Sequence, residues 1–214
     1  MQESPEPIVT QLVSDLQPVT PLTLSKGLCY AFASAAASAV AVVAAFGIRE
    51  DLKAGYLDPV PMLAAGLFLV LGLASSVTVI TMSRPQVGSN HEGWTWTAAM
   101  VALLPFSALA TARGKGEGLL NDESIARGLE CLLIGGGASV LVLAMLVWWL
   151  RKGAPTSPVR AGLLSGVAAG SLGIFAFSLH CADNDIAHIG LWHTGVVALM
   201  AAIGRMIVPP LVRW

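Results

Sequence analysis

Residues 27–48 of this 214-residue chain read GLCYAFASAAASAVAVVAAFGI, a stretch without a single charged side chain. A helix of about 20 apolar residues is long enough to cross the hydrocarbon core of a bilayer. A helix on the surface of a soluble protein would instead carry charged or amide side chains along one face. Residues 31–47 have no such face on either side of a helix. This stretch therefore predicts a transmembrane helix.

Five more windows share this length and apolar character: residues 61–82, 94–112, 131–150, 161–180 and 191–208. The whole chain is 55% hydrophobic and 12% charged, whereas a soluble domain has about a quarter charged residues. Its mean hydropathy of +0.73 agrees with this composition. We therefore predict an all-α polytopic membrane protein, in which residues 26–214 form a six-helix transmembrane bundle and residues 1–25 precede it.

Six crossings place both termini on the same side of the membrane. With the N-terminus inside, seven of the 12 Lys and Arg residues fall in cytoplasmic segments and five in outer segments. Cytoplasmic segments of membrane proteins carry the excess of Lys and Arg. This bias favours cytoplasmic N- and C-termini.

The segment before the first window predicts a short amphipathic helix over residues 8–16, between Pro7 and Pro18. Its apolar face consists of residues at helical spacing, namely Ile8, Val9, Leu12, Val13 and Leu16. Asp15 lies on the polar face, which has no Lys or Arg, although helices on membrane surfaces usually carry them there. A groove in a soluble partner protein fits this helix better. Packing on the bilayer or on the bundle is the alternative.

Two of the three cysteines are predicted to share the outer end of the bundle, because Cys131 begins the fourth window and Cys181 directly follows the fifth. Cys29 lies in the first window and is predicted to pack inside the bundle. Other side chains that could bind a metal lie near the outer pair, namely Glu130, His180, Asp183, Asp185, His188 and His193. Thiolate and imidazole suit soft or borderline metals, and two thiols can also form a disulfide. The pair therefore predicts a redox or metal role, although His180, Asp183 and Asp185 could equally be ordinary hydrophilic loop residues.

Several function classes are disfavoured by what the sequence lacks. It has no CxxC, HExxH or P-loop motif, no acidic residue inside a window, and no basic cluster that would suit nucleic acid. These absences count against an enzyme, an ion-coupled transporter and a DNA-binding protein. A membrane thiol oxidoreductase or redox carrier that uses the outer cysteine pair is the remaining catalytic alternative. Gly162, Gly166 and Gly170 recur every fourth residue, which predicts close helix packing inside the bundle rather than at a dimer seam.

Three stretches together resemble one known family. They are LVSDLQPV at residues 12–19, RKGAP at 151–155, and the ending with LWHTGV at 191–196, GR at 204–205 and LVRW at 211–214. In order and spacing the chain is similar, from residue 12 to 214, to the NrsF-like family of membrane anti-sigma factors. These are negative regulators of extracytoplasmic-function sigma factors in Gram-negative bacteria.

The resemblance implies a protein of the bacterial inner membrane with a cytoplasmic N-terminus. Residues 1–25 would bind the sigma factor there and keep it from RNA polymerase, with Ile8, Val9, Leu12, Val13, Asp15 and Leu16 as the contact residues. Cys131 and Cys181 would sense heavy metals or oxidants in the periplasm as a disulfide or a transient thiophilic-metal site. Supporting roles would fall to His180, His188, His193 and Glu130. The implied partners are the sigma factor and membrane lipid, with no permanent cofactor.

Overall fold

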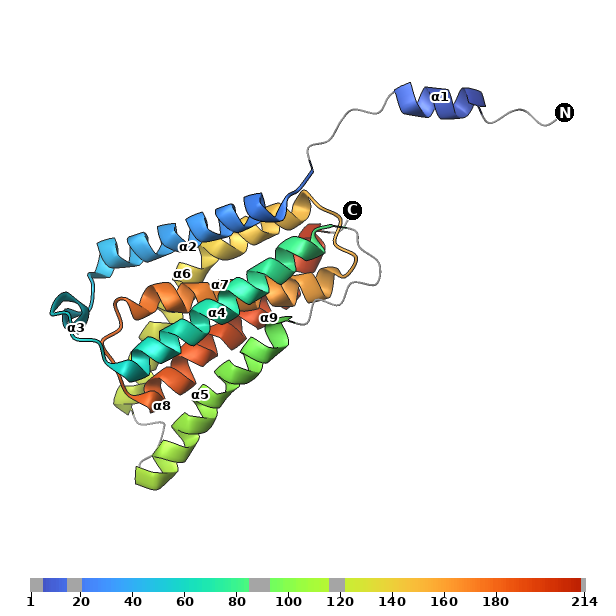
Figure 1. Ribbon diagram of the computed structural model, residues 1–214. Coiled ribbons are helices and arrows are strands. Elements are labelled where there is room, and N and C mark those ends of the chain that lie inside the picture. Colours follow the sequence, from blue (N-terminus) through green and yellow to red (C-terminus); the bar gives the residue numbers. More distant parts are fainter. Residues whose placement is uncertain (1–5, 15–20, 85–92, 116–121, 213–214) are drawn as a thin grey trace.

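The computed structural model describes residues 6–14, 21–84, 93–115 and 122–212 of the chain (Figure 1). These residues form helices and connecting loops, with no strand among them. The elements in chain order are α1 Glu6–Ser14, α2 Leu24–Phe46, α3 Glu50–Lys53, α4 Pro59–Met82, α5 Gly93–Lys115, α6 Asp122–Arg151, α7 Pro158–Ser178, α8 Ile186–His188, the π-helix η1 Ile189–His193, and α9 Thr194–Val212.

Six helical segments of the described residues are long and apolar enough to cross a membrane. They are α2, α4, most of α5 and α6, α7, and the continuous segment Ile186–Val212, which joins α8, η1 and α9. The predicted all-α class and the six apolar windows are confirmed. The start of α2 and the end of α9 lie at the same end of the bundle (Figure 1).

The fourth span differs from its prediction, because α6 begins at Asp122 and not at Cys131. The extra turns contain acidic and basic residues, such as Arg127 and Glu130, and these lower the hydropathy of the stretch. Glu, Arg, Ala and Leu nevertheless favour helix, so the backbone continues unbroken through them. Cys131 therefore lies inside a helix that projects beyond the apolar window, and is not its first residue.

Helix α7 lies at the centre of the bundle, and its glycines make the close packing possible. A Cβ atom on Gly166 would fall on the backbone carbonyl of Met200 in α9, and one on Gly170 would lie 2.9 Å from the Cα atom of Val197. Gly162 and Gly204 face each other in the same way. The glycine repeat therefore packs α7 directly on the backbone of α9, inside one chain, as its spacing predicted.

The segment that leads from α1 into α2 is held by hydrogen bonds at the end of the bundle where α2 starts. The guanidinium of Arg84, just after α4, donates from Nε and Nη2 to the carbonyl of Leu22, at 2.9 and 2.6 Å. The neighbouring Ser83 accepts from the indole Nε1 of Trp149 in α6 at 3.1 Å. The Ser83 carbonyl also accepts from the backbone N–H of Ala154 at 2.9 Å. Residues 83 and 84 thus connect α4, α6 and the N-terminal linker.

Substitution of Arg84 by glutamine should loosen this linker without unfolding the bundle. Both hydrogen bonds to the Leu22 carbonyl are lost, and because Arg84 is exposed the effect stays small. We expect amide hydrogen exchange over residues 22–26 to rise by about three- to tenfold, with global stability changed by less than about 1 kcal/mol. Arg160→Gln, an exposed arginine at the start of α7, is the matched control. Equal exchange in both variants would show that Arg84 does not hold the linker.

Candidate functional site

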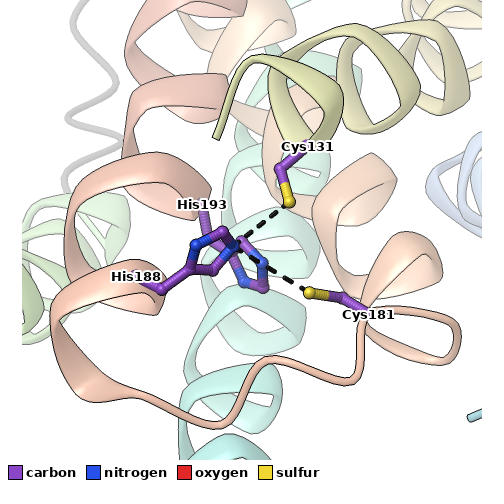
Figure 2. Close-up of side chains that lie close together, drawn as sticks. All are labelled: Cys131, Cys181, His188 and His193. Carbon is purple, nitrogen blue, oxygen red and sulfur yellow. Dashed lines mark hydrogen bonds between the residues drawn. The ribbon is translucent and has the colours of Figure 1, made fainter. Parts of the chain in front are cut away.

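Four side chains that suit soft or borderline metals meet at the end of the bundle where α2 finishes (Figure 2). They are Cys131 in α6, Cys181 in the loop after α7, His188 at the end of α8 and His193 at the end of η1, and we call them the quartet. One sulfur or ring-nitrogen atom from each lies within 4.8 Å of the other three. Their relative exposures are only 5, 8, 5 and 4%, so the site is buried.

The imidazole of His188 faces both sulfur atoms with one nitrogen (Figure 2). Its Nε2 atom is 3.1 Å from Cys131 Sγ and 4.0 Å from Cys181 Sγ (Figure 2). The ring of His193 stands edge-on to that of His188, with ring centroids 5.5 Å apart. Segments separated by 50 or more residues in the chain thus bring two thiols and two imidazoles to one point.

A carboxylate orients the central histidine. Asp183 Oδ2 lies 3.4 Å from His188 Nδ1, on the side of the ring that faces away from the sulfurs, and 3.5 Å from Nη1 of Arg127. Such a carboxylate favours the tautomer with hydrogen on Nδ1, which leaves the Nε2 lone pair for a metal or a thiol. From the sequence, Asp183 was named as a possible metal-binding side chain near the cysteine pair, with an ordinary loop residue as the alternative, and Arg127 was missed. The position of Asp183, two residues after Cys181, was the available signal, since carboxylates commonly hold histidine ligands.

The π-helix explains how His188 and His193 come to share one side of the last span. In an α-helix, residues five apart point about 140° away from each other. The wider turn of the π-helix η1 brings such residues closer to the same side of the helix. Single π turns inside α-helices are frequent at functional sites. Their local departure from α-helical geometry is not visible in hydropathy, so the sequence named both histidines without showing that they meet.

The two other predicted support residues lie near the quartet but outside it. His180 Nδ1 is 3.2 Å from the carbonyl oxygen of Gly47, and its ring packs between those of Phe46 and Phe177. The side chain of Glu130 is exposed at the mouth of the site. His180 therefore connects the end of α2 to the end of α7. Glu130 could act on the quartet only from the exposed edge of the site.

A cavity of about 420 Å³ leads to the quartet. Its lining includes both thiols, His188 and His180, and polar side chains surround them, namely Arg127, Glu130, Asp183 and Asn184. Because Arg127 and Glu130 are exposed, the cavity connects the buried sulfurs to the exterior of the protein. It has room for a metal ion or a small oxidant to approach.

The surroundings of Cys181 make its thiol easier to ionise. A hydrogen bond from the thiol of Cys131 lowers the pKa of Cys181, and the neighbouring imidazoles of His188 and His193 lower it further, against the effect of burial. The thiolate is the form of cysteine that binds metals and reacts with oxidants. The lowered pKa favours the thiolate form of Cys181.

The third cysteine lies outside the site. Cys29 is exposed on α2 and does not pack inside the bundle, so that prediction was wrong. It offers a natural control for experiments on the other two thiols.

The predicted N-terminal helix is present as α1, Glu6–Ser14, at the far end of the linker from the bundle (Figure 1). Pro7 lies in its first turn, where proline is tolerated. Val9 and Val13 are 54 and 58% exposed, so these two apolar side chains are available to a partner. Asp15 and Leu16 lie outside the described residues, as do the side chains of Ile8 and Leu12.

Comparison with known proteins relates the chain to one family of regulators. A family model described as NrsF, negative regulator of sigma F, matches residues 12–214. The chain is 27% identical over 188 residues to the probable anti-sigma-F factor NrsF of Azospira oryzae, with 84% of each chain covered. It is 29% identical over 174 residues to the anti-sigma-F factor NrsF of Caulobacter vibrioides, with 78% of each covered. No solved structure matches.

These matches decide between the regulatory and the catalytic interpretation. The family model covers the whole helical bundle and both cysteines of the quartet, but only residues 12–14 of the N-terminal helix α1. Its description is that of a regulator, so the role is regulatory and the oxidoreductase alternative is set aside. The chain belongs to the NrsF family of anti-sigma factors, negative regulators of sigma F.

Proposed function

We propose that this anti-sigma factor resides in the bacterial inner membrane and holds an extracytoplasmic-function sigma factor through its cytoplasmic segment, residues 1–25. Reaction of Cys131 and Cys181 with a heavy metal or an oxidant on the periplasmic side then releases the sigma factor. The observation that carries this proposal is the meeting of both thiols with His188 at one end of the bundle, while the linker from α1 enters at the other.

Helix α6 offers one mechanical link between these ends. It carries Cys131 near its start and Trp149 near its end, about 27 Å apart at 1.5 Å per residue. The Trp149 indole donates to Ser83, next to the Arg84 that holds the linker through Leu22. A shift of α6 along or around its axis would therefore disturb the anchor of the N-terminal segment.

Helix α2 offers a second link. The backbone N–H of Arg49, just past its end, donates to the carbonyl of Leu179 at 3.0 Å. The buried guanidinium of Arg49 also bonds Asn184 and Asp51. The loop that carries Cys181 is thereby tied to the end of α2, whose other end continues into the N-terminal linker. For a signal to pass, the modified thiols must favour a second packing in which the sigma factor is bound less tightly.

Exchange of both thiols for serine should abolish the response to stress. In cells, the rise in transcription that cadmium or peroxide causes should be smaller by about tenfold or more in C131S/C181S than in the wild type. Serine preserves the shape of the side chain but forms neither a disulfide nor a strong bond to a soft metal. The measurement is a reporter fused to a promoter that depends on the sigma factor.

Cys29→Ser should respond like the wild type, because Cys29 lies away from the quartet. Full induction in C131S/C181S would exclude the thiols as the sensor. Constitutive transcription in that variant, at equal protein level, would instead show that the thiols are needed for repression.

A further inference from the structure

We infer that the quartet is a four-coordinate Zn²⁺ site, occupied in the resting protein, and that metal and oxidant stimuli both act on this one ion. The inference rests on the proposed sensing role of the thiols for its consequence, but the binding of zinc can be measured separately. Two cysteines and two histidines are a common donor set of structural zinc sites. Here they come from α6, the α7–α8 loop, α8 and η1, and all four are buried.

The spacing of the donor atoms suits this ion. Zinc bonds of about 2.3 Å to sulfur and 2.0–2.1 Å to nitrogen place tetrahedral donors roughly 3.3–3.8 Å apart. Cys131 Sγ and Cys181 Sγ are 3.1 and 4.0 Å from His188 Nε2, and no pair of donors is more than 4.8 Å apart. Side-chain shifts of about 1 Å or less would complete the coordination.

Two polar features of the site fit a bound cation. His193 Nε2 is buried and has no hydrogen-bond partner among the described residues, which ordinarily costs about 1–3 kcal/mol. Asp183 holds the far nitrogen of His188, the arrangement of a carboxylate, a histidine and a metal that fixes the ligating tautomer. A zinc ion in the quartet would give His193 Nε2 the partner that it lacks. Asp183 turns the Nε2 atom of His188 toward the same ion.

Four protein donors leave no open coordination position, so the ion would hold segments together and would not activate water. It would tie the start of α6 to the loop after α7 and to the start of the last span. A soft ion such as Cd²⁺ competes for the same thiolates by exchange. A peroxide would take two electrons from the two zinc-bound thiolates. An S–S bond forms, the O–O bond breaks, two protons are taken up, and two waters and free Zn²⁺ are released.

Both reactions remove Zn²⁺ from the quartet, so both break the zinc bonds to the two histidines. Loss of zinc frees His188 and His193 from α6 even when a disulfide keeps the two cysteines joined. The last span could then move relative to α6. One site would thus answer two chemically different stimuli.

The test uses the full-length protein in detergent, expressed with zinc in the medium. Elemental analysis should give one zinc ion per chain, and replacement by Co²⁺ should produce the intense visible bands of a tetrahedral site with thiolate charge transfer. His188→Gln and His193→Gln should each weaken zinc binding by about tenfold or more, and Asp183→Asn by about 10- to 100-fold. His180→Gln is the matched control, since His180 lies at the rim and outside the quartet.

Absence of zinc after loading, or octahedral cobalt spectra, would overturn the inference, and these readouts on the wild type do not depend on whether a variant folds. Equal zinc affinity in the two quartet histidine variants and in His180→Gln would also overturn it. If the wild type binds no zinc yet C131S/C181S loses the stress response, the sensing role stands and the zinc site does not. If zinc binds as described but its removal leaves the sigma factor bound, the zinc site stands and the sensing role fails.

Discussion

Gly166→Leu is expected to destroy the fold of the bundle, because it places a large side chain where α7 touches the backbone of α9. Even a Cβ atom at this position would fall on the carbonyl of Met200, which as backbone cannot rotate away. The helices would have to separate, and α7 packs against α9 more extensively than against any other described helix. Overpacking of a close interface costs about 3 kcal/mol or more, a large fraction of the stability of a typical domain.

Gly136→Leu is the matched control for this prediction. Gly136 lies in the middle of α6, and a Cβ atom there would meet no atom within 4 Å. The same change in size and helix propensity should therefore leave the melting temperature in detergent nearly unchanged, while the Gly166 variant aggregates or melts far lower. Similar melting of both variants would show that α7 and α9 do not pack as closely as described.

Two charges on the apolar face of α1 are expected to release the sigma factor without any stimulus. Burial of one valine side chain at an interface is worth about 1.5 kcal/mol or more, so loss of Val9 and Val13 removes about 3 kcal/mol before any charge is buried. V9D/V13D should therefore weaken sigma-factor binding by about 100-fold or more. The measurement is co-purification from cells, followed by titration of the purified anti-sigma factor with its sigma factor.

Q11D/S14D supplies the control, since it adds the same two charges on the opposite side of the helix. Gln11 and Ser14 are exposed and belong to the predicted polar face. This variant should bind the sigma factor within a few-fold of the wild type. If V9D/V13D binds equally well, α1 is not the contact surface, and the proposed role of residues 1–25 fails.

The sequence predicted the scaffold well, because membrane insertion depends on long apolar windows that can be read directly. Residues 27–48 and the windows that follow gave the six spans. The start of α6 was predicted nine residues too late, at Cys131 and not at Asp122. A hydropathy window ends where charged residues such as Arg127 begin, even when the helix continues through them. The glycines of α7 were also informative, because small residues at every fourth position have few uses other than close packing.

The sequence predicted which end of the bundle holds the site, but not which side chains contact one another there. Cys131 and Cys181 followed from counting spans, which places them at one end of the bundle. That His188 reaches both sulfurs depends on the loop after α7, and that His193 joins it depends on the π-helix η1. Both are local backbone features that apolar periodicity does not encode. Asp183 became significant only once the structure placed it beside His188.

The central claim is that the state of the quartet controls how tightly the sigma factor is held. The most direct measurement uses the full-length protein in nanodiscs with a fluorescently labelled sigma factor bound, and follows anisotropy as one equivalent of Cd²⁺ or peroxide is added. We predict dissociation from the wild type by both reagents, and no change in anisotropy when either reagent is added to C131S/C181S. Retention by the wild type, or equal release from the double variant, would contradict the claim.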